Sequence, residues 1–393
     1  AMASEMAEWI GVHPPLYDPN LSYIENLQKG PFCPPSVLES LPPRPAVPLS
    51  ERVSFLGHEL NSTVGVPAGP LLGSKWTTLA AQLGFDIVTY KTIRSREHPS
   101  HPVPNSLFVD TSTLKEKPGG GHEVWVCEDQ QQQRLPSVSA LTITNSYGMP
   151  SMSREYLATD LRKAKEGIGE GQMLIVSVVG TQRSDGVSLG DDYAEAASFA
   201  QQHGAMAVEL NLSCPNVDKK SGSLYQDPQS VYDLSKRVVA ELQPTATPVI
   251  VKVGDFPHQQ DLQKQVMQSA SRAGVRAFCG LNSVPMTVHK TQSGACVPAL
   301  GADRPTAGVC GELIRPWAVA FIREAARIRR EDGGMDGMAV MGVGGITQPE
   351  HFRDFLEAGA DAALTATAMW WDPLIALKYH RQRAAANGLT GVV

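Results

Sequence analysis

The 393-residue sequence lacks several features that would each indicate a particular class of protein. No apolar run reaches membrane-spanning length, and the first residues show neither the basic nor the apolar region of a secretion signal. We therefore expect no membrane association and a reducing, cytoplasmic location. Positive charge is not in excess, because 34 Lys and Arg face 40 Asp and Glu and the net charge is −6. This balance gives no electrostatic reason to expect nucleic acid and favours a small-molecule ligand.

Cysteine is scarce, and its spacing disfavours the common metal centres. The sequence has no CxxC pair and no Cys/His cluster of zinc spacing, since its six cysteines are scattered as Cys33, Cys127, Cys214, Cys279, Cys296 and Cys310. We therefore expect neither a metal site nor an iron–sulfur cluster.

From about residue 51 onward, short apolar runs alternate with amphipathic stretches, which is the pattern of βα units and a parallel sheet. The runs predicted as strands lie at 64–68, 85–91, 173–180, 207–212, 248–253, 277–282, 338–344 and 362–368. Helices are predicted at 191–203, 229–242, 259–273, 316–329 and 349–358, the last with Thr347 as N-cap and Gly359 just beyond its end. Eight strands alternating with helices predict an α/β fold, the (β/α)8 TIM barrel. A doubly wound sheet is the alternative, although the glycine-rich fingerprint expected after its first strand is missing.

Other segments precede or interrupt this pattern. Residues 1–50 are rich in proline and are predicted to form an irregular extension laid over the surface of a barrel domain at 51–393. The prolines also argue against an amphipathic membrane helix in this extension. Long intervals at 94–138 and 285–308 are predicted to be loops. Because loops that follow barrel strands build the active-site face, we expect these two to shape it.

One stretch, Glu-Leu-Asn-Leu-Ser-Cys-Pro-Asn at 209–216, indicates chemistry more directly than any other. Pro215 removes a ladder donor, so Cys214 lies where a predicted strand becomes a loop. A thiol there can act as a proton acceptor, a nucleophile or a metal ligand, and a small buried core residue is the ordinary alternative. Asn211 and Asn216 add carboxamides on both sides, which suit a ring edge that alternates C=O and N–H groups.

Polar residues recur at the ends of the predicted strands, where a barrel gathers them on one face. A lysine inside an apolar run, such as Lys252, is costly to bury unless it meets an anion or an acceptor, although any one lysine could instead reach the surface. Gly344 and Gly345 lie at the end of the seventh predicted strand and Thr367 at the end of the eighth, where barrels commonly hold a phosphate on backbone N–H groups. A flavin mononucleotide (FMN) across the barrel mouth would use all of these features. The polar strand-end residues are Lys91, Thr92, Ser177, Asn211, Lys252, Asn282 and Ser283, and Asn145 follows the first long interval.

These residues resemble those of the flavin-dependent dihydroorotate dehydrogenases, most closely the class 1 enzymes that use a cysteine base. The resemblance covers residues 64–373. It is carried by Asn-Leu-Ser-Cys-Pro-Asn-Val at 211–217 and Asn-Ser-Tyr-Gly-Met-Pro at 145–150. The shorter matches Lys91-Thr92, Val251-Lys252, Asn282-Ser283, Gly344-Gly345 and Thr367-Ala368 follow in the same order.

The resemblance implies an FMN-containing barrel that oxidises (S)-dihydroorotate to orotate, with Cys214 removing a proton from C5 while hydride leaves C6 for the flavin. It implies that the substrate is bound by Lys91, Asn145, Tyr147, Gly148, Met149, Asn211, Asn216, Asn282 and Ser283. It implies that the cofactor is bound by Ala68, Gly69, Lys91, Thr92, Ser177, Asn211, Lys252, Gly311, Gly344, Gly345, Ala366 and Thr367. A soluble electron acceptor is expected, and the resemblance suggests a homodimer.

The sequence departs from the class 1 pattern in ways that bear on the substrate. Ala366 stands where a glycine usually precedes the phosphate-binding threonine, and residues 298–316 are more similar to dihydropyrimidine dehydrogenases. Because backbone amides at 145–150 could hold a carboxylate that uracil-type substrates lack, dihydroorotate is the first expectation. The alternatives are a dihydropyrimidine dehydrogenase-like or biosynthetic relative that acts on another cyclic amide. More distant ones are a barrel lyase that forms a Schiff base on Lys252 and a barrel kept only for binding.

Overall fold

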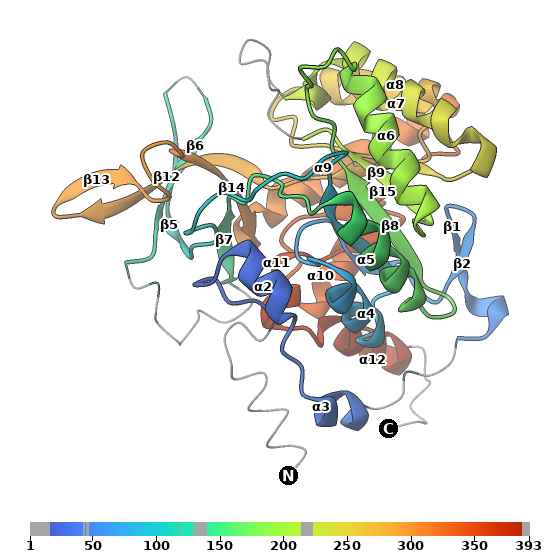
Figure 1. The fold of residues 1–393 in the computed structure, drawn as a ribbon, viewed down its shortest axis with the longest axis horizontal. Helices are drawn as coiled ribbons and strands as arrows, with labels where there is room; N and C mark the ends of the chain where they lie inside the picture. Colours follow the sequence, from blue (N-terminus) through green and yellow to red (C-terminus); the bar gives the residue numbers. More distant parts are fainter. Residues whose placement is uncertain are drawn as a thin grey trace.

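The computed structural model describes residues 16–41, 44, 47–118, 120–128, 130, 140–213 and 223–386. Within these residues, eight parallel strands close into a barrel, which confirms the predicted α/β TIM-barrel fold (Figure 1). Each of them overlaps a strand predicted from the sequence. In their order around the barrel they are β3 (Val64–Val66), β4 (Ile87–Ile93), β8 (Met173–Val178), β9 (Ala207–Asn211), β10 (Val249–Lys252), β11 (Ala277–Gly280), β15 (Ala339–Val343) and β16 (Ala362–Leu364).

The apolar runs form strands because they are buried on both faces. Ile175, Ile250 and Met341 point into the barrel interior, where they pack together, while their chain neighbours pack against the surrounding helices. The hairpin of β1 (Val53–Phe55) and β2 (His58–Leu60) contributes Phe55 and Leu60 to the interior cluster. Mostly apolar side chains therefore fill the interior of the barrel, which is typical of this fold.

Helices cover the barrel, and all five predicted ones are present. Gly359 follows the last predicted helix with φ +106°, as expected for a residue just past a C-terminus. The predicted N-cap of that helix was wrong: Gln348 occupies the position, and the Thr347 hydroxyl instead donates to Glu312 Oε2 at 3.0 Å. The helices are α4 (Ser74–Gln82), α5 (Arg154–Glu166), α6 (Leu189–Gln202), α7 (Pro228–Leu242), α8 (Gln260–Ala273), α9 (Arg315–Glu331), α10 (Pro349–Glu357), α11 (Thr367–Trp371) and α12 (Ile375–Ala386). Short 3₁₀ turns lie at Leu49–Glu51, Leu224–Gln226, Gln243–Thr245, Glu312–Ile314 and Gly333–Met335.

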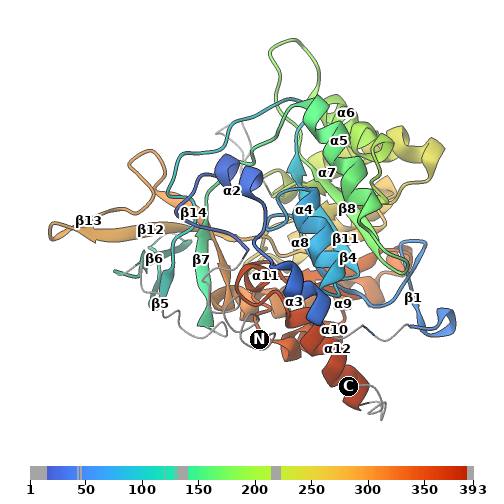
Figure 2. The ribbon, with the colours of Figure 1, turned by 60° about the horizontal axis from the view of Figure 1, so that its bottom comes forward.

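A second sheet projects from one side of the barrel, and the prediction of two long loops was wrong for much of both intervals (Figures 1 and 2). The missed signal is the alternation Val284, Met286, Val288, whose side chains are buried while those between them face outward. The parallel pairing of β6 with β12 joins segments more than a hundred residues apart. The local sequence of either interval was therefore not enough to predict its strands. The strands are β5 (Val109–Glu116), β6 (His122–Val126), β7 (Thr142–Asn145), β12 (Val284–Gln292), β13 (Ala295–Pro298) and β14 (Thr306–Gly311).

The segment before the barrel is more ordered than predicted. It contains α2 (Tyr23–Lys29), whose N-cap Ser22 and Glu25 form a capping box, and α3 (Pro35–Ser40), which begins with proline at its first position. The Tyr17 ring lies 4.0 Å from the Trp370 ring in a stacked arrangement. The described part of this segment therefore contacts the barrel domain. None of the helices in the described part of the chain is long and apolar enough to cross a membrane.

Candidate active site

A cavity of about 600 Å³ lies between the carboxyl ends of the barrel strands and the second sheet. The barrel supplies one wall, with residues such as Lys91 and Lys252 at its strand ends. The second sheet supplies the facing wall, with Asn145 from β7 and Cys310 from β14. We call the first wall the floor and the second the roof. Because two independent sheets enclose it, the cavity combines residues from widely separated parts of the chain.

Nearly all the predicted site residues that the structure describes line this one cavity. The exception is Ser177, which is fully buried and accepts a hydrogen bond from the Thr92 hydroxyl at 3.1 Å. Ser177 therefore lies behind Thr92 and orients it. Cys214 and Asn216 lie outside the described residues. The predicted residues brought together are Ala68, Gly69, Lys91, Thr92, Asn145, Tyr147, Gly148, Met149, Asn211, Lys252, Asn282, Ser283, Gly311, Gly344, Gly345, Ala366 and Thr367.

Two carboxamides of the floor are joined through one hydroxyl. Asn211 Oδ1 accepts a hydrogen bond from the Ser213 hydroxyl at 2.6 Å, and Asn282 Nδ2 donates to that same hydroxyl. The parallel register places Asn211 beside Lys252, so the amide pair and a lysine occupy adjacent strand ends. The arrangement fixes the orientation of both amides, and an orientation fixed in advance lowers the entropic cost of binding a polar ring.

The loop at 145–150 is held against the floor by residues that follow β4. Arg94 donates from Nε to the Met149 carbonyl at 3.0 Å and from Nη1 to Thr181 Oγ1 at 2.8 Å. Gly148 has φ +76°, and a Cβ at this position would lie 2.6 Å from the His101 ring. Glycine is therefore required here both by the backbone and by the packing.

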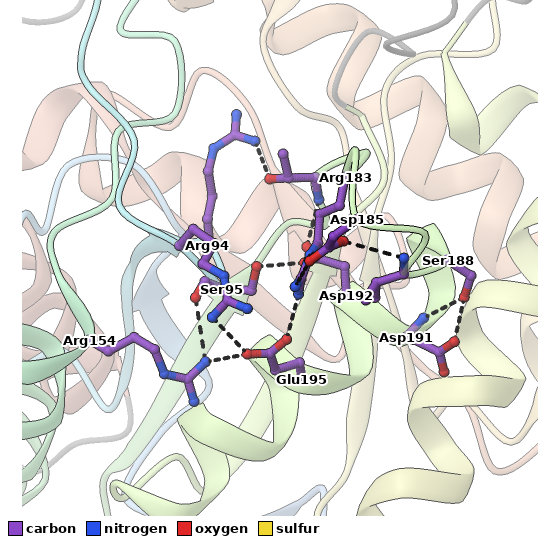
Figure 3. A network of polar contacts seen from close by, with 12 residues as sticks. Arg94, Ser95, Arg154, Arg183, Asp185, Ser188, Asp191, Asp192 and Glu195 are labelled. Atoms are coloured by element: carbon purple, nitrogen blue, oxygen red, sulfur yellow. Dashed lines mark hydrogen bonds and ion pairs between the residues drawn. The ribbon is translucent and has the colours of Figure 1, made fainter.

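A charged network anchors Arg94 and the loop after β8 (Figure 3). Its centre is Asp192, a fully buried residue of α6. Asp192 accepts hydrogen bonds from the Ser95 hydroxyl at 2.6 Å and from the Thr181 backbone N–H at 2.7 Å. Arg183 and Glu195 extend the network toward the surface. Since buried and multiply bonded groups hold one geometry, the loop at 145–150 rests on a rigid support.

Positive charge dominates the cavity. Lys91, Arg94 and Lys252 line it, and among its described lining residues none is Asp or Glu. Burial, and secondarily the nearby Arg94 guanidinium, lowers the pKa of Lys91 from 10.5 to about 8. Lys252 is 2% exposed and lies at the end of an apolar strand. Cations held in such surroundings are stabilised by an anionic ligand.

One end of the cavity is built from glycine backbone. Gly311, Gly344 and Gly345 have φ of +109°, +126° and +77°. A Cβ on Gly311 would lie 2.1 Å from the Leu141 carbonyl oxygen, and one on Gly345 would lie 2.8 Å from the Gly311 carbonyl oxygen. Only glycine fits there, and its backbone N–H groups can be approached closely. These residues suit a phosphate group.

Comparison with known proteins places this arrangement in a family. A sequence profile described as dihydroorotate dehydrogenase matches residues 126–383. The dihydroorotate dehydrogenase of Dictyostelium discoideum is 41% identical over 377 residues, which cover 95% of this chain and 98% of that protein. This chain belongs to the dihydroorotate dehydrogenase family. It is accordingly a flavin-dependent oxidoreductase.

Two prokaryotic members of the dihydroorotate dehydrogenase family match a smaller part of the chain. The dihydroorotate dehydrogenase A (fumarate) of Limosilactobacillus reuteri is 30% identical over 187 residues, 47% of this chain and 55% of that protein. The dihydroorotate dehydrogenase B (NAD(+)) catalytic subunit of Thermoplasma acidophilum is 28% identical over 229 residues, 58% of this chain and 67% of that protein. The Dictyostelium match, by contrast, spans almost the whole of both chains.

The structure explains one departure from the dihydroorotate dehydrogenase pattern. Ala366, at a position where the class 1 sequences usually have glycine, has φ −102°. This backbone conformation is open to any residue, so alanine is accommodated without strain.

Several residues that line the cavity were not predicted from the sequence. Arg94 could have been found, because it follows Lys91 and Thr92 at the end of the same strand. His98 and His101 carry no such signal, since they reach the cavity only because backbone hydrogen bonds pair them with residues 147–151. Further examples are Thr306 and Cys310 from the second sheet and Trp370 from α11.

Proposed function

We propose that this protein oxidises (S)-dihydroorotate to orotate and that its flavin is FMN. The observation that carries the proposal is the charge of the cavity: three cations line it, and no carboxylate is present among its described lining residues. A phosphate and a ring carboxylate are the two anions that this reaction would place there. A neutral dihydropyrimidine would leave the substrate end without a counter-charge.

The residues present fit FMN. Gly311, Gly344, Gly345 and Thr367 would surround its phosphate, and Lys252 would lie near the ring. When bound, the flavin supplies the hydride acceptor for C6 of the dihydropyrimidine. Support comes from the glycine backbone described above, whose N–H groups accommodate an anion without side-chain obstruction.

Cys214 is proposed as the base that removes the proton from C5. It is the next residue after Ser213, which lines the cavity and is bonded to Asn211. A free thiol has a pKa of about 8.5, so only a modest depression makes it a usable base near neutrality. Asn145, Asn216 and Asn282, together with Asn211 and Ser283, are proposed to hold the polar edges of the ring. Lys91 is proposed to contact both substrate and flavin.

The substrate carboxylate is proposed to bind at the loop at 145–150. The Gly148 and Met149 carbonyls are turned toward Arg94 and accept its hydrogen bonds, at 3.0 Å for Met149 and 3.4 Å for Gly148. With those carbonyls occupied, the loop can present N–H groups to the cavity, where an anion also gains from Lys91.

Anaerobic titration tests both parts of the proposal. The purified protein should be yellow, and heat-released flavin should co-elute with FMN. Dihydroorotate should bleach the flavin rapidly, whereas dihydrouracil and other neutral cyclic amides should do so slowly. Bleaching by dihydrouracil in preference to dihydroorotate would assign the site to a dihydropyrimidine dehydrogenase-like reaction, and no bleaching by any ring would refute both.

We further propose a soluble electron acceptor and a homodimer, in the cytoplasm. The relative from Limosilactobacillus reuteri is named for fumarate, which is one such acceptor. Rapid reoxidation of the bleached flavin by fumarate or another soluble compound, but not by a quinone in lipid vesicles, would support the first. Sedimentation at a mass of two chains would support the second.

A further inference from the structure

Three side chains from three adjacent strands of the second sheet face the same way. Antiparallel pairing sets His289 of β12 opposite Pro298 and Thr291 opposite Cys296 of β13, so His289 and Cys296 are diagonal neighbours on one face. Parallel pairing sets Glu123 of β6 beside Thr287, which shares that face. The register therefore brings a thiol, an imidazole and a carboxylate into line.

The distances join the three groups into one hydrogen-bonded series. Cys296 Sγ lies 3.3 Å from His289 Nδ1, and His289 Nε2 lies 3.2 Å from Glu123 Oε2. With the carboxylate accepting from Nε2–H, the Nδ1 lone pair faces the thiol. A nucleophile in contact with a base, and that base held by a third group, is the arrangement that activates side-chain nucleophiles.

The imidazole is held in place by its surroundings, and the thiol is open to solvent. The Trp125 ring lies 4.5 Å from the His289 ring, and Val288 on the opposite face is fully buried. Cys296 is exposed. The base is therefore fixed beside a thiol that a small molecule in solution can reach.

The other described cysteines lack this combination. Burial raises the pKa of Cys33 to about 11 and raises that of Cys127 as well. Cys279 is buried in the barrel interior, and Cys310 lines the cavity with its pKa raised by burial. Because the thiolate is the reactive form, these cysteines are the slower ones to react.

We propose that Cys296 is a modification site that forms mixed disulfides with low-molecular-weight disulfides such as oxidised glutathione, with His289 as its base and Glu123 as the group that orients the base. The Cys296 thiol gives its proton to His289 Nδ1, and the sulfur attacks one sulfur of the reagent. The S–S bond of the reagent breaks, a new S–S bond to Cys296 forms, and the departing thiolate takes the proton from the imidazolium. Cys296 is oxidised and half of the reagent is reduced to a thiol, so atoms and electrons balance.

The full-length protein is incubated with oxidised glutathione, and the adduct at each cysteine is quantified by mass spectrometry of peptides. Cys296 should react at least about tenfold faster than Cys127, which directly follows strand β6 and serves as an internal control. His289→Gln should slow Cys296 by about tenfold, and Glu123→Gln by a smaller factor. Imidazole added to His289→Ala should restore part of the rate.

Whether the reaction rate of Cys296 falls or rises in His289→Gln shows whether His289 acts as a base or only supports the structure of the hairpin. If His289→Gln only loosened the hairpin, Cys296 would become more accessible and its rate would rise or stay constant, which would overturn the proposal. Equal rates at Cys296 and Cys127 in the unchanged protein would also overturn it. Flavin bleaching by dihydroorotate should be the same in all of these variants and in Cys296→Ser, because none of the three residues lines the cavity.

Discussion

The barrel is a parallel sheet buried on both faces, whereas the second sheet is largely antiparallel and exposes part of one face to solvent. Every residue of β4 is buried, while β12 alternates between buried and partly or fully exposed positions over residues 284–289 and is not buried beyond them. Parallel strands covered on both sides are stabilised by apolar packing on each face, and an alternating sheet has one free face that can change without disturbing its packing. The comparison suggests different roles for the two sheets. The barrel holds the proposed reactive residues in fixed positions, and the second sheet forms a roof whose exposed face can vary.

The largest effect should come from Cys214, the proposed base, compared with Cys310, a thiol that lines the cavity. Cys214→Ala, just past barrel strand β9, should slow flavin bleaching by about 10² to 10⁴-fold, the usual range for loss of a general base. Cys310→Ala on β14 should slow it by less than about tenfold, because burial raises the pKa of that thiol and makes it a poor proton acceptor near neutrality. Stopped-flow measurement of anaerobic bleaching decides between them. If Cys310→Ala slowed bleaching more than Cys214→Ala, the base would belong to the second sheet, and the proposed difference in roles between the two sheets would be wrong.

A side chain in the barrel interior and one in the second sheet should also differ in the stability that they contribute. Ile175→Ala removes a fully buried side chain from the barrel interior and should lower the free energy of unfolding by about 2–5 kcal/mol. Val288→Ala removes two methyl groups from the second sheet and should cost about 1.5–2 kcal/mol. Urea titration followed by far-UV circular dichroism measures both. A larger loss for Val288→Ala would show that the second sheet is the more tightly packed part.

The difference between the two regions also explains why the barrel strands, but not the strands of the second sheet, were predicted from the sequence. Each barrel strand is a predominantly apolar run, such as Val249 to Val251 before Lys252, and most of these runs are followed by a stretch with the period of a helix, so the local pattern was enough to predict them. Strand β12 carries the alternation of a half-buried strand, but its partners β6 and β14 come from elsewhere in the chain. Long-range pairing of this kind leaves only a weak local signal.

The same limit applies to the cavity. Lys252 and Asn211 were predictable because barrel topology alone brings strand ends together. His98 and His101 were not, because they reach the cavity through backbone pairing with residues 147–151, and Cys310 was not, because its position depends on how the second sheet folds over the barrel. The assignment of Thr347 as an N-cap failed for a related reason: its hydroxyl bonds to Glu312, a residue far away in sequence.

A smaller effect should distinguish a lysine of the floor from a lysine of the second sheet, because only the first should make ligand binding depend on pH. Burial and Arg94 lower the pKa of Lys91 to about 8, so Lys91 is charged below that pH and neutral above it. Binding of the anion orotate to the oxidised enzyme should therefore weaken as pH rises through 8, by at most about tenfold per pH unit. Lys91→Met should remove this dependence, and Lys115→Met on β5 should leave it unchanged. Spectral titration of the bound flavin with orotate measures the dissociation constant at each pH. A pH dependence that persists in Lys91→Met would assign the titration to another group.

The smallest effect concerns the turn of the β12–β13 hairpin, far from the barrel along the sheet. Ser293 and Gly294 both have positive φ, 51° and 77°, which is the geometry of a type I′ turn. Asn tolerates this conformation better than Ser, so Ser293→Asn should stabilise the hairpin by a few tenths of a kcal/mol. Because the gain is confined to the free end of the second sheet, hydrogen exchange of the Gln292 and Ala295 amides should slow while the melting temperature and flavin bleaching stay constant. A rise in the melting temperature of the whole protein would instead mean that the hairpin unfolds together with the barrel, and the two sheets would have to be treated as one cooperative unit.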